Sequence, residues 1–211
     1  MFDLYLKELL AWNKKFNLTA ITDPEEIRIK HFEDSLTILQ TIKLTNQSVI
    51  DVGTGAGFPG IPLKIVCPEL KLTLLEATQK KVEFLKHIVS VLNLQDVEIF
   101  WERAEEIVKN KRESFDIALS RAVAKLNVLC EYCLPLVKIG GMFIAYKEKE
   151  IEKEVEESKN AIHILGGKIK EIKKVKLPNS DIIRSLVIIE KISPTPPRFP
   201  RRAGMAKKKP L

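Results

Sequence analysis

The fold of this chain is decided by one stretch, which reads Ser48-Val49-Ile50-Asp51-Val52-Gly53-Thr54-Gly55-Ala56-Gly57-Phe58-Pro59-Gly60-Ile61. A short β-branched run leads past an acid into alternating glycines, after which the apolar residues take helical spacing. The pattern predicts a strand, a tight turn and the start of a helix. Glycine adopts positive φ and lets a ligand approach the backbone, and loops of this kind hold nucleotide-like ligands at strand ends.

The spacing of the glycines separates two classes of nucleotide site. A dinucleotide fingerprint has glycines at its first, third and sixth positions, and the sixth position counted from Gly53 is Phe58. In this chain Gly53, Gly55 and Gly57 occupy the first, third and fifth positions. The spacing therefore argues against a nicotinamide dinucleotide.

Two acids flank the glycine loop. Asp51 lies at the carboxyl end of the first predicted strand, where it can receive a cationic group such as an amino-acid ammonium. The next predicted strand, residues 71–76, ends in Glu76, where this architecture holds ribose hydroxyls. An acid, three alternating glycines and a second acid resemble the S-adenosylmethionine site of class I methyltransferases. A nicotinamide-dependent oxidoreductase and an α/β domain whose glycines only make a turn are the alternatives.

Alternating strand and helix patterns predict the fold class. Strands are expected at residues 48–52, 71–76, 97–101, 115–120 and 142–146, with helices between them, which requires a parallel sheet covered on both faces. A charged helix over 148–165 precedes two further strands, 168–177 and 184–192, whose short connection requires an antiparallel pair. We therefore expect an α/β, Rossmann-like class I methyltransferase fold: a seven-stranded, mostly parallel sheet with a C-terminal antiparallel hairpin, plus N-terminal helices.

Length and charge bound the organisation of the chain. Its 211 residues suit one domain, expected over 1–193 with a helical addition at about 1–45. Residues 198–211 hold six cations and no acid, which is six of the seven net positive charges. A basic, proline-containing tail is therefore expected over 194–211, with a polyanion as its natural partner.

The distribution of apolar residues and cysteines indicates the cell compartment and the redox chemistry of the protein. The sequence has no run of 18 apolar residues and no signal-peptide core, so we expect a cytoplasmic protein that does not enter a membrane, and a monomer. Cys130 and Cys133 form a Cys-x-x-Cys, which is typical of a redox pair or half a zinc site, but they lie in an apolar helical stretch without a second pair. We expect them to be buried as small hydrophobic residues, and we expect no metal site.

Several short motifs make the resemblance more specific. They are Asn17-Leu18-Thr19, His31-Phe32-Glu33-Asp34-Ser35-Leu36, Asp51 to Pro62, Glu76-Ala77-Thr78-Gln79-Lys80-Lys81, Arg103-Ala104-Glu105-Glu106, Ser120-Arg121-Ala122 and Phe199-Pro200-Arg201-Arg202-Ala203-Gly204. Together they resemble the RsmG family, also called glucose-inhibited division protein B. The resemblance implies methyl transfer from S-adenosylmethionine to N7 of a guanine in the decoding region of bacterial 16S rRNA, with that RNA or the small ribosomal subunit as partner. A non-catalytic RNA-binding module on the same fold is the alternative.

The resemblance also implies cofactor contacts, residue by residue. They are Gly53 and Phe58 at the glycine loop, Glu76, Ala77 and Thr78 at the ribose, Ala104 and Glu105 at the adenine, and Arg121 at the methionine end. Guanine N7 carries a lone pair and no proton, so it can attack the sulfonium methyl directly. We therefore expect the protein to align and desolvate the reactants, without a catalytic general base.

Cations at the carboxyl edge of the sheet are expected to hold RNA. The residues that follow or begin strands there are Lys80, Arg103, Arg121, Lys147 and Arg184. Each is either a phosphate contact or a solvated charge. Tyr146 either stacks on a base or belongs to the core, and the polar segment His31 to Ser35 is either a solvated helix face or a surface that faces a ligand.

The tail is expected to be extended and mobile without RNA. Its prolines cannot continue a strand or helix, and its cations repel one another. The functional interpretation is that Arg198, Arg201 and Arg202 bind phosphates while Phe199 offers an apolar or stacking contact. The alternative is a tail that only increases solubility.

Overall fold

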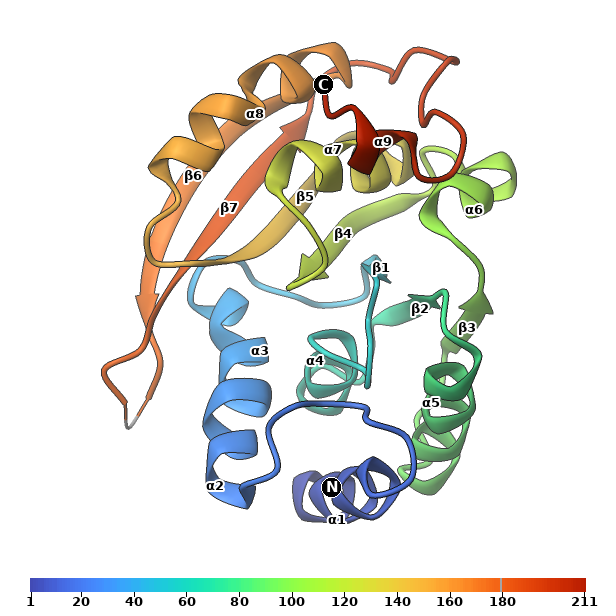
Figure 1. The fold of residues 1–211 in the computed structure, drawn as a ribbon, viewed down its shortest axis with the longest axis vertical. Coiled ribbons are helices and arrows are strands. Elements are labelled where there is room, and N and C mark those ends of the chain that lie inside the picture. Colours follow the sequence, from blue (N-terminus) through green and yellow to red (C-terminus); the bar gives the residue numbers. More distant parts are fainter. Residues whose placement is uncertain (179) are drawn as a thin grey trace.

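The computed structural model describes residues 1–178 and 180–211, which form a sheet between two layers of helices (Figure 1). The strands are β1 (Ser48–Val52), β2 (Lys71–Glu76), β3 (Val97–Trp101), β4 (Phe115–Arg121), β5 (Val137–Glu148), β6 (Gly167–Lys176) and β7 (Ile183–Lys191). Their order is β3-β2-β1-β4-β5-β7-β6, with β1 to β5 parallel and β7 antiparallel to both β5 and β6. The predicted fold class is confirmed.

The main difference from the predicted elements lies at β5. This strand extends over Val137–Glu148, so the charged helix α8 (Glu152–Ile164) begins four residues later than the sequence pattern suggested. The extension has a tertiary cause, because Lys147 and Glu148 pair with Ser185 and Arg184 of β7. Pairing with a partner strand thus outweighs the helix preference of the glutamates.

Helices cover both faces of the sheet, as the alternating pattern predicted (Figure 1). One face packs against α1 (Phe2–Asn13), α4 (Gly60–Val66) and α5 (Gln79–Val91), and the other against α6 (Ala104–Lys111), α7 (Leu126–Cys133) and α8. Cys130 and Cys133 are free and fully buried in α7, and burial raises the pKa of both thiols. They pack as small apolar residues.

The N-terminal segment before the sheet contains an irregular helix. It begins as α2 (Pro24–Ile27), where the Asp23 carboxylate accepts a hydrogen bond of 2.8 Å from the Glu26 amide. It continues as a π-helical turn, η1 (Arg28–Glu33), then α3 (Asp34–Leu36) and a 3-10 turn, η2 (Thr37–Gln40). Turns of the π type often occur at functional sites. This one brings His31 and Asp34 to the carboxyl edge of the sheet.

The expectation of an extended, mobile tail is wrong. Phe199 and Ala206 are buried at 4% and 1% exposure in the apolar cluster around α6, α7 and α8, and Met205–Lys208 form the short helix α9 beside α7 (Figure 1). These residues of the tail therefore pack on the domain expected over 1–193. The expectation of a mobile tail was based on its prolines and charges, and these do not show whether the tail has an apolar side to bury.

An ion pair also fixes the tail to the body. The Arg201 guanidinium donates hydrogen bonds of 2.9 and 2.5 Å to the two carboxylate oxygens of Glu131, a residue of α7 that is 1% exposed. Arg112 donates to the carbonyls of Thr195, at 3.2 Å, and Phe199. Arg201 is therefore ion-paired within the protein, and its expected contact with a phosphate, which would require it to exchange that partner, stays a prediction, whereas Arg198 and Arg202 are exposed.

Replacing Arg201 by alanine should destabilise the protein. The variant leaves the buried Glu131 carboxylate without its partner, so we expect the free energy of unfolding to fall by about 3 to 5 kcal/mol. Urea unfolding followed by circular dichroism measures this, with Arg202→Ala as the matched exposed control. Equal stability of the two variants would show that the tail is not anchored through Arg201.

Candidate active site

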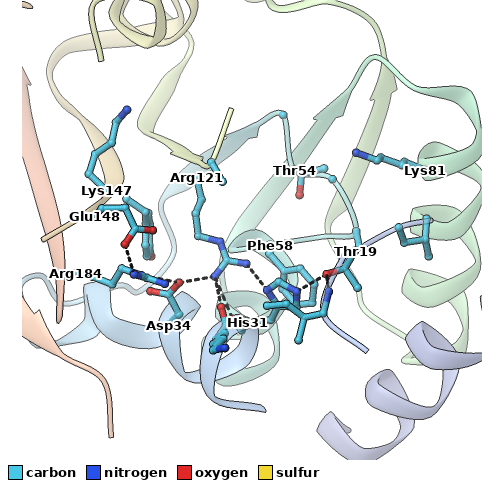
Figure 2. A pocket seen from close by; sticks show the side chains of 18 of the residues that line it. Thr19, His31, Asp34, Thr54, Phe58, Lys81, Arg121, Lys147, Glu148 and Arg184 are labelled. Atoms are coloured by element: carbon cyan, nitrogen blue, oxygen red, sulfur yellow. Dashed lines mark hydrogen bonds and ion pairs between the residues drawn. The ribbon is translucent and has the colours of Figure 1, made fainter. Parts of the chain in front are cut away.

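A cavity of about 500 Å³ opens at the carboxyl edge of the sheet (Figure 2). Its walls come from the glycine loop after β1, the ends of β4 and β5, the start of β7, and the N-terminal segment around Thr19 and His31. The carboxyl ends of parallel strands meet at this edge, which is where open α/β sheets bind ligands. Of the predicted site residues, Gly53, Gly55, Phe58, Arg121, Lys147 and Arg184 line the cavity.

Asp51 supports the glycine loop from behind. The residue is fully buried, and its Oδ2 atom accepts hydrogen bonds from the Thr54 hydroxyl, at 2.6 Å, and the Gly60 amide, at 2.8 Å. Burial raises the pKa of its carboxyl to about 6, and these hydrogen bonds oppose the rise. Asp51 does not line the cavity. Its geometry is that of a residue that shapes the loop, while its Oδ1 atom has no hydrogen-bond partner among the described residues, and its expected role as the acceptor for an ammonium group stays a prediction.

Glu76 joins the glycine loop to the loop that follows β2. Its two carboxylate oxygens accept hydrogen bonds from the Gly55 amide, at 3.0 Å, and the Thr78 amide, at 2.8 Å. Ala77 and Thr78 are exposed beside it. A Cβ atom added at Gly55 would meet no atom within 4 Å, so this glycine presents bare backbone to open space.

The other predicted loop residues pack within the protein. A Cβ atom at Gly57 would lie 2.6 Å from the Tyr5 hydroxyl, so this glycine allows α1 to pack closely on the loop. Phe58 is 6% exposed and stacks on His31, with ring centroids 4.6 Å apart. Phe58 therefore supports one side of the cavity floor.

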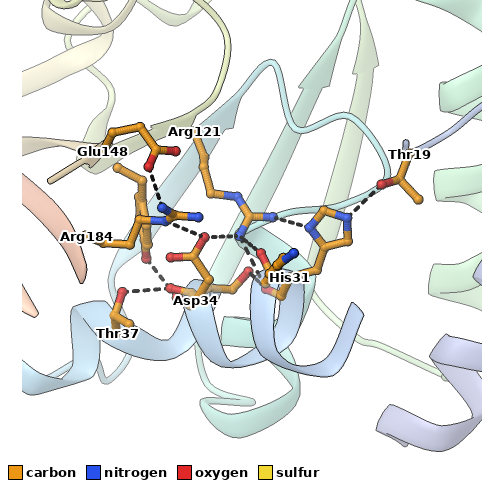
Figure 3. Close-up of polar contacts among 10 residues, drawn as sticks. Thr19, His31, Asp34, Thr37, Arg121, Glu148 and Arg184 are labelled. Atoms are coloured by element: carbon orange, nitrogen blue, oxygen red, sulfur yellow. Dashed lines mark hydrogen bonds and ion pairs between the residues drawn. The ribbon is translucent and has the colours of Figure 1, made fainter. Parts of the chain in front are cut away.

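The Asp34 carboxylate links three separate elements at the cavity (Figure 3). Its Oδ2 atom accepts hydrogen bonds from Arg121 of β4, at 3.0 Å, and Arg184 of β7, at 3.4 Å. Arg121 also donates to the carbonyls of Lys30 and His31, each at 3.3 Å, and its guanidinium carbon lies 5.3 Å from the centre of the Phe58 ring. Arg121 is thereby held in one position above the floor, with its side chain 10% exposed.

His31 is a neutral residue of the cavity wall. Its Nε2 atom lies 2.7 Å from the Thr19 hydroxyl and its Nδ1 atom 3.4 Å from Arg121. Burial, and then the Arg121 charge, lower the pKa of His31 to about 4. The segment His31 to Ser35, for which the sequence left two interpretations open, thus places His31 and Asp34 toward the cavity.

The predicted adenine residues lie outside the cavity lining. Ala104 and Glu105 begin α6 and are buried at 8% and 9% exposure. The Glu105 side chain accepts a hydrogen bond of 3.0 Å from the Gly204 amide, so it holds the tail. Any contact of this pair with an adenine would come from the backbone or from the Ala104 methyl group.

Three of the predicted rim cations are ion-paired, Arg121 with Asp34 among them. Lys147 donates to the Ala124 carbonyl, at 2.7 Å, and to Glu154, at 2.5 Å. Arg184 donates to Glu148 at 2.5 Å. By contrast, Lys80 and Arg103 are exposed.

Tyr146 belongs to the core. It is 3% exposed and donates a hydrogen bond of 2.8 Å to the Ser35 carbonyl, although its edge still lines the cavity. Sequence reasoning did not assign Thr19, Lys81 or Glu154, which also line the cavity. The sequence signals were the motif Asn17-Leu18-Thr19, whose place beside His31 depends on the turn of the N-terminal segment, and the motif Glu76 to Lys81, which contains Lys81.

The comparisons with known proteins identify the family. The family model described as rRNA small subunit methyltransferase G (GidB) matches residues 1–184. The chain belongs to this family. A "Ribosomal RNA small subunit methyltransferase G" of Alkaliphilus metalliredigens is 53% identical over 210 residues, covering 98% of this chain and 88% of that protein. One of Thermoanaerobacter pseudethanolicus is 50% identical and covers 100% and 89%.

Solved methyltransferase structures share the fold of this GidB-family chain. One is a complex between the Haloferax volcanii Trm112 methyltransferase activator and a putative methyltransferase, with a TM-score of 0.63 and 14% identity over 88% of this chain and 98% of that one. Another is M. jannaschii TYW2 in complex with AdoMet, with a TM-score of 0.57 and 17% identity over 70% of each chain.

Within residues 1–178 and 180–211, no helix combines the length and apolar character that a membrane crossing needs. In the same residues, no three His, Cys, Asp or Glu side chains form a group that could hold a metal ion.

The lowered pKa of His31 predicts a dependence of stability on pH. The folded protein binds a proton at His31 only near pH 4, whereas the unfolded chain binds it near pH 6.5. Stability from this group is therefore full above pH 6.5 and falls as the pH drops towards 4, by at most about 3 kcal/mol. Urea unfolding of the wild type and of His31→Gln at pH 7 and pH 5 tests this. The difference in free energy of unfolding between the wild type and His31→Gln should be smaller at pH 5 than at pH 7. A difference that does not change with pH would contradict the prediction.

Proposed function

We propose that this chain transfers a methyl group from S-adenosylmethionine to N7 of a guanine in the decoding region of bacterial 16S rRNA. Family membership supports the reaction and the RNA substrate. The observation in the structure that carries the proposal is the glycine loop, whose open backbone at Gly55 and carboxylate at Glu76 stand together at the carboxyl edge of the sheet. These are the features that a nucleoside with two ribose hydroxyls requires.

The residues present fit S-adenosylmethionine. Glu76, Ala77 and Thr78 would hold the ribose, and Gly55 leaves room for the ligand against the backbone. Gly53, which lines the cavity, would contact the cofactor. Arg121 would bind the methionine carboxylate, since Asp34 and two carbonyls hold its guanidinium at the cavity floor. Asp34 is in this view a positioning residue.

The cavity is suited to a reaction that needs alignment. The bound cofactor would supply an electrophilic sulfonium methyl group, and guanine N7 brings its own lone pair. Both nitrogens of His31 already face partners, Thr19 and Arg121, so this imidazole is held in place as part of the wall. The chain's contribution is to orient the two reactants and exclude water around them, without removing a proton.

Exposed cations around the cavity would bind the RNA backbone. Lys80, Arg103, Arg198 and Arg202 are exposed, whereas Arg121, Lys147 and Arg184 are paired with acids and would bind phosphate only by exchanging those partners. The partner is 16S rRNA or the small ribosomal subunit. We also propose that the protein is cytoplasmic and acts as a monomer. Sedimentation analysis can test the oligomeric state.

The proposed activity is tested by binding and by transfer. Calorimetry should show binding of S-adenosylmethionine and none of NAD, because Phe58 occupies the position at which a dinucleotide site needs its third glycine. Tritium from labelled cofactor should enter 16S rRNA, either naked or in 30S subunits, as 7-methylguanine. Cofactor binding without transfer to any form of the RNA would instead favour a non-catalytic RNA-binding module.

Replacing Glu76 by alanine should weaken cofactor binding at least about tenfold. The variant loses the acceptor for the ribose hydroxyls and also the link between the Gly55 and Thr78 amides, and hydrogen bonds to a charged group contribute about 1.5 to 3 kcal/mol each. Calorimetry on the folded variant measures the loss, with Glu156→Ala on the exposed face of α8 as control. Unchanged affinity for Glu76→Ala would refute the ribose assignment.

A further inference from the structure

We propose that the indole of Trp101 is a stacking platform for an unpaired base of the substrate RNA that lies beside the methylated guanine. The proposal rests on the proposed function, since it assigns a binding surface for the same RNA. The surface, called here the Trp101 strip, comprises Lys80, Lys81, Trp101 and Arg103.

The exposure of Trp101 is unusual for its size. Its exposed fraction is 56%, and among the exposed large apolar residues of the described chain it is the only aromatic one. The other tryptophan, Trp12, packs against Phe84 and His87. An exposed tryptophan leaves a large apolar plane in water, which is the kind of surface that marks an interaction site.

The indole is also fixed in place. Its Nε1 atom donates a hydrogen bond of 3.1 Å to the Ala77 carbonyl, and the residue ends β3 directly beside Glu76 of β2. A ring that is held before the ligand arrives loses little conformational freedom on stacking. The hydrogen bond uses the polar edge of the indole and leaves its apolar face for a partner.

The fixed indole lies on the path to the cavity. The Ala77 carbonyl that holds it immediately precedes Thr78 and the first turn of α5, and Lys81 in that turn lines the cavity. Figure 2 shows Lys81 at the side of the cavity that is opposite Lys147 and Arg184. A strand of RNA whose guanine enters the cavity would therefore pass along the Trp101 strip.

The charge of this surface selects a polyanion. Lys80 and Arg103 are exposed, and Lys80 Nζ lies 5.5 Å from the centre of the half-buried Phe16 ring. Of the acids nearby, Glu76 is buried and bonded to two amides, and Glu105 is buried and bonded to the Gly204 amide. Glu102 is half-buried, and the exposed Glu106 pairs with Lys109. Cations beside an aromatic plane are the combination that binds single-stranded nucleic acid.

The docked tail adds to the same surface. The Gly204 amide bonds to Glu105 in the first turn of α6, two residues after Arg103. This contact holds the tail, with exposed Arg202 two residues before Gly204, at the start of α6. Guanine N7 chemistry requires a base that is accessible, and RNA bases freed from their own stack bind to aromatic side chains.

Three variants test the platform. Trp101→Ala should weaken binding of labelled decoding-region RNA by about 5- to 150-fold, the equivalent of one lost base stack of about 1 to 3 kcal/mol. Trp101→Phe keeps a ring but loses the hydrogen bond to Ala77. Its affinity for RNA should lie between that of the wild type and that of Trp101→Ala. Ile172→Ala, an exposed apolar residue of β6 that is 38% exposed, is the matched control and should bind like the wild type.

Cofactor affinity and fluorescence complete the test. Calorimetry should give the same S-adenosylmethionine affinity for Trp101→Ala and the wild type. In a Trp12→Phe background Trp101 is the single tryptophan, and its fluorescence should be quenched on adding RNA. RNA affinity unchanged in Trp101→Ala, or a loss of cofactor affinity without a loss of RNA affinity, would overturn the platform. Failure of the proposed function would instead appear as a wild type that binds no cofactor.

Discussion

The site depends on two carboxylates at neighbouring strand ends that bind the backbone of one glycine loop. Asp51 accepts from Thr54 and Gly60, and Glu76 accepts from Gly55. The charge of Asp51 is costly inside the protein, as the rise of its pKa to about 6 shows, and bonds to the loop offset part of that cost. A loop of glycines has much conformational freedom to lose, and these bonds fix it in one shape.

A second carboxylate connects the N-terminal segment to the sheet. Asp34 reaches the site through the π-helical turn and bonds to Arg121 and Arg184, which belong to strands on opposite sides of β5. Its Oδ2 atom serves both arginines, whereas its Oδ1 atom has no hydrogen-bond partner among the described residues. The segment from Leu18 to Asp34 thus contributes to the cavity wall.

The tail changes where positive charge is available. The sequence predicts six cations on a free arm. In the structure Arg201 pairs with Glu131, and Phe199 is buried in the apolar cluster around α6, α7 and α8. The exposed cations that remain belong to a segment that is held at the start of α6 by Gly204 and packs beside α7 through α9. A displayed cation binds a phosphate with less loss of conformational freedom than one on a flexible arm.

The sequence by itself determined the order of the elements, the parallel sheet with its antiparallel hairpin, the glycine loop and its acids. These follow from local patterns, since apolar period and glycine spacing depend on neighbours along the chain. Tertiary structure decided the direction in which Asp51 points, the pairing of Arg121 with Asp34, and the docking of the tail. Those features depend on residues such as Asp34 and Arg184, 150 positions apart, whose meeting no local pattern records. The cost of a buried charge then fixes which partner each side chain takes.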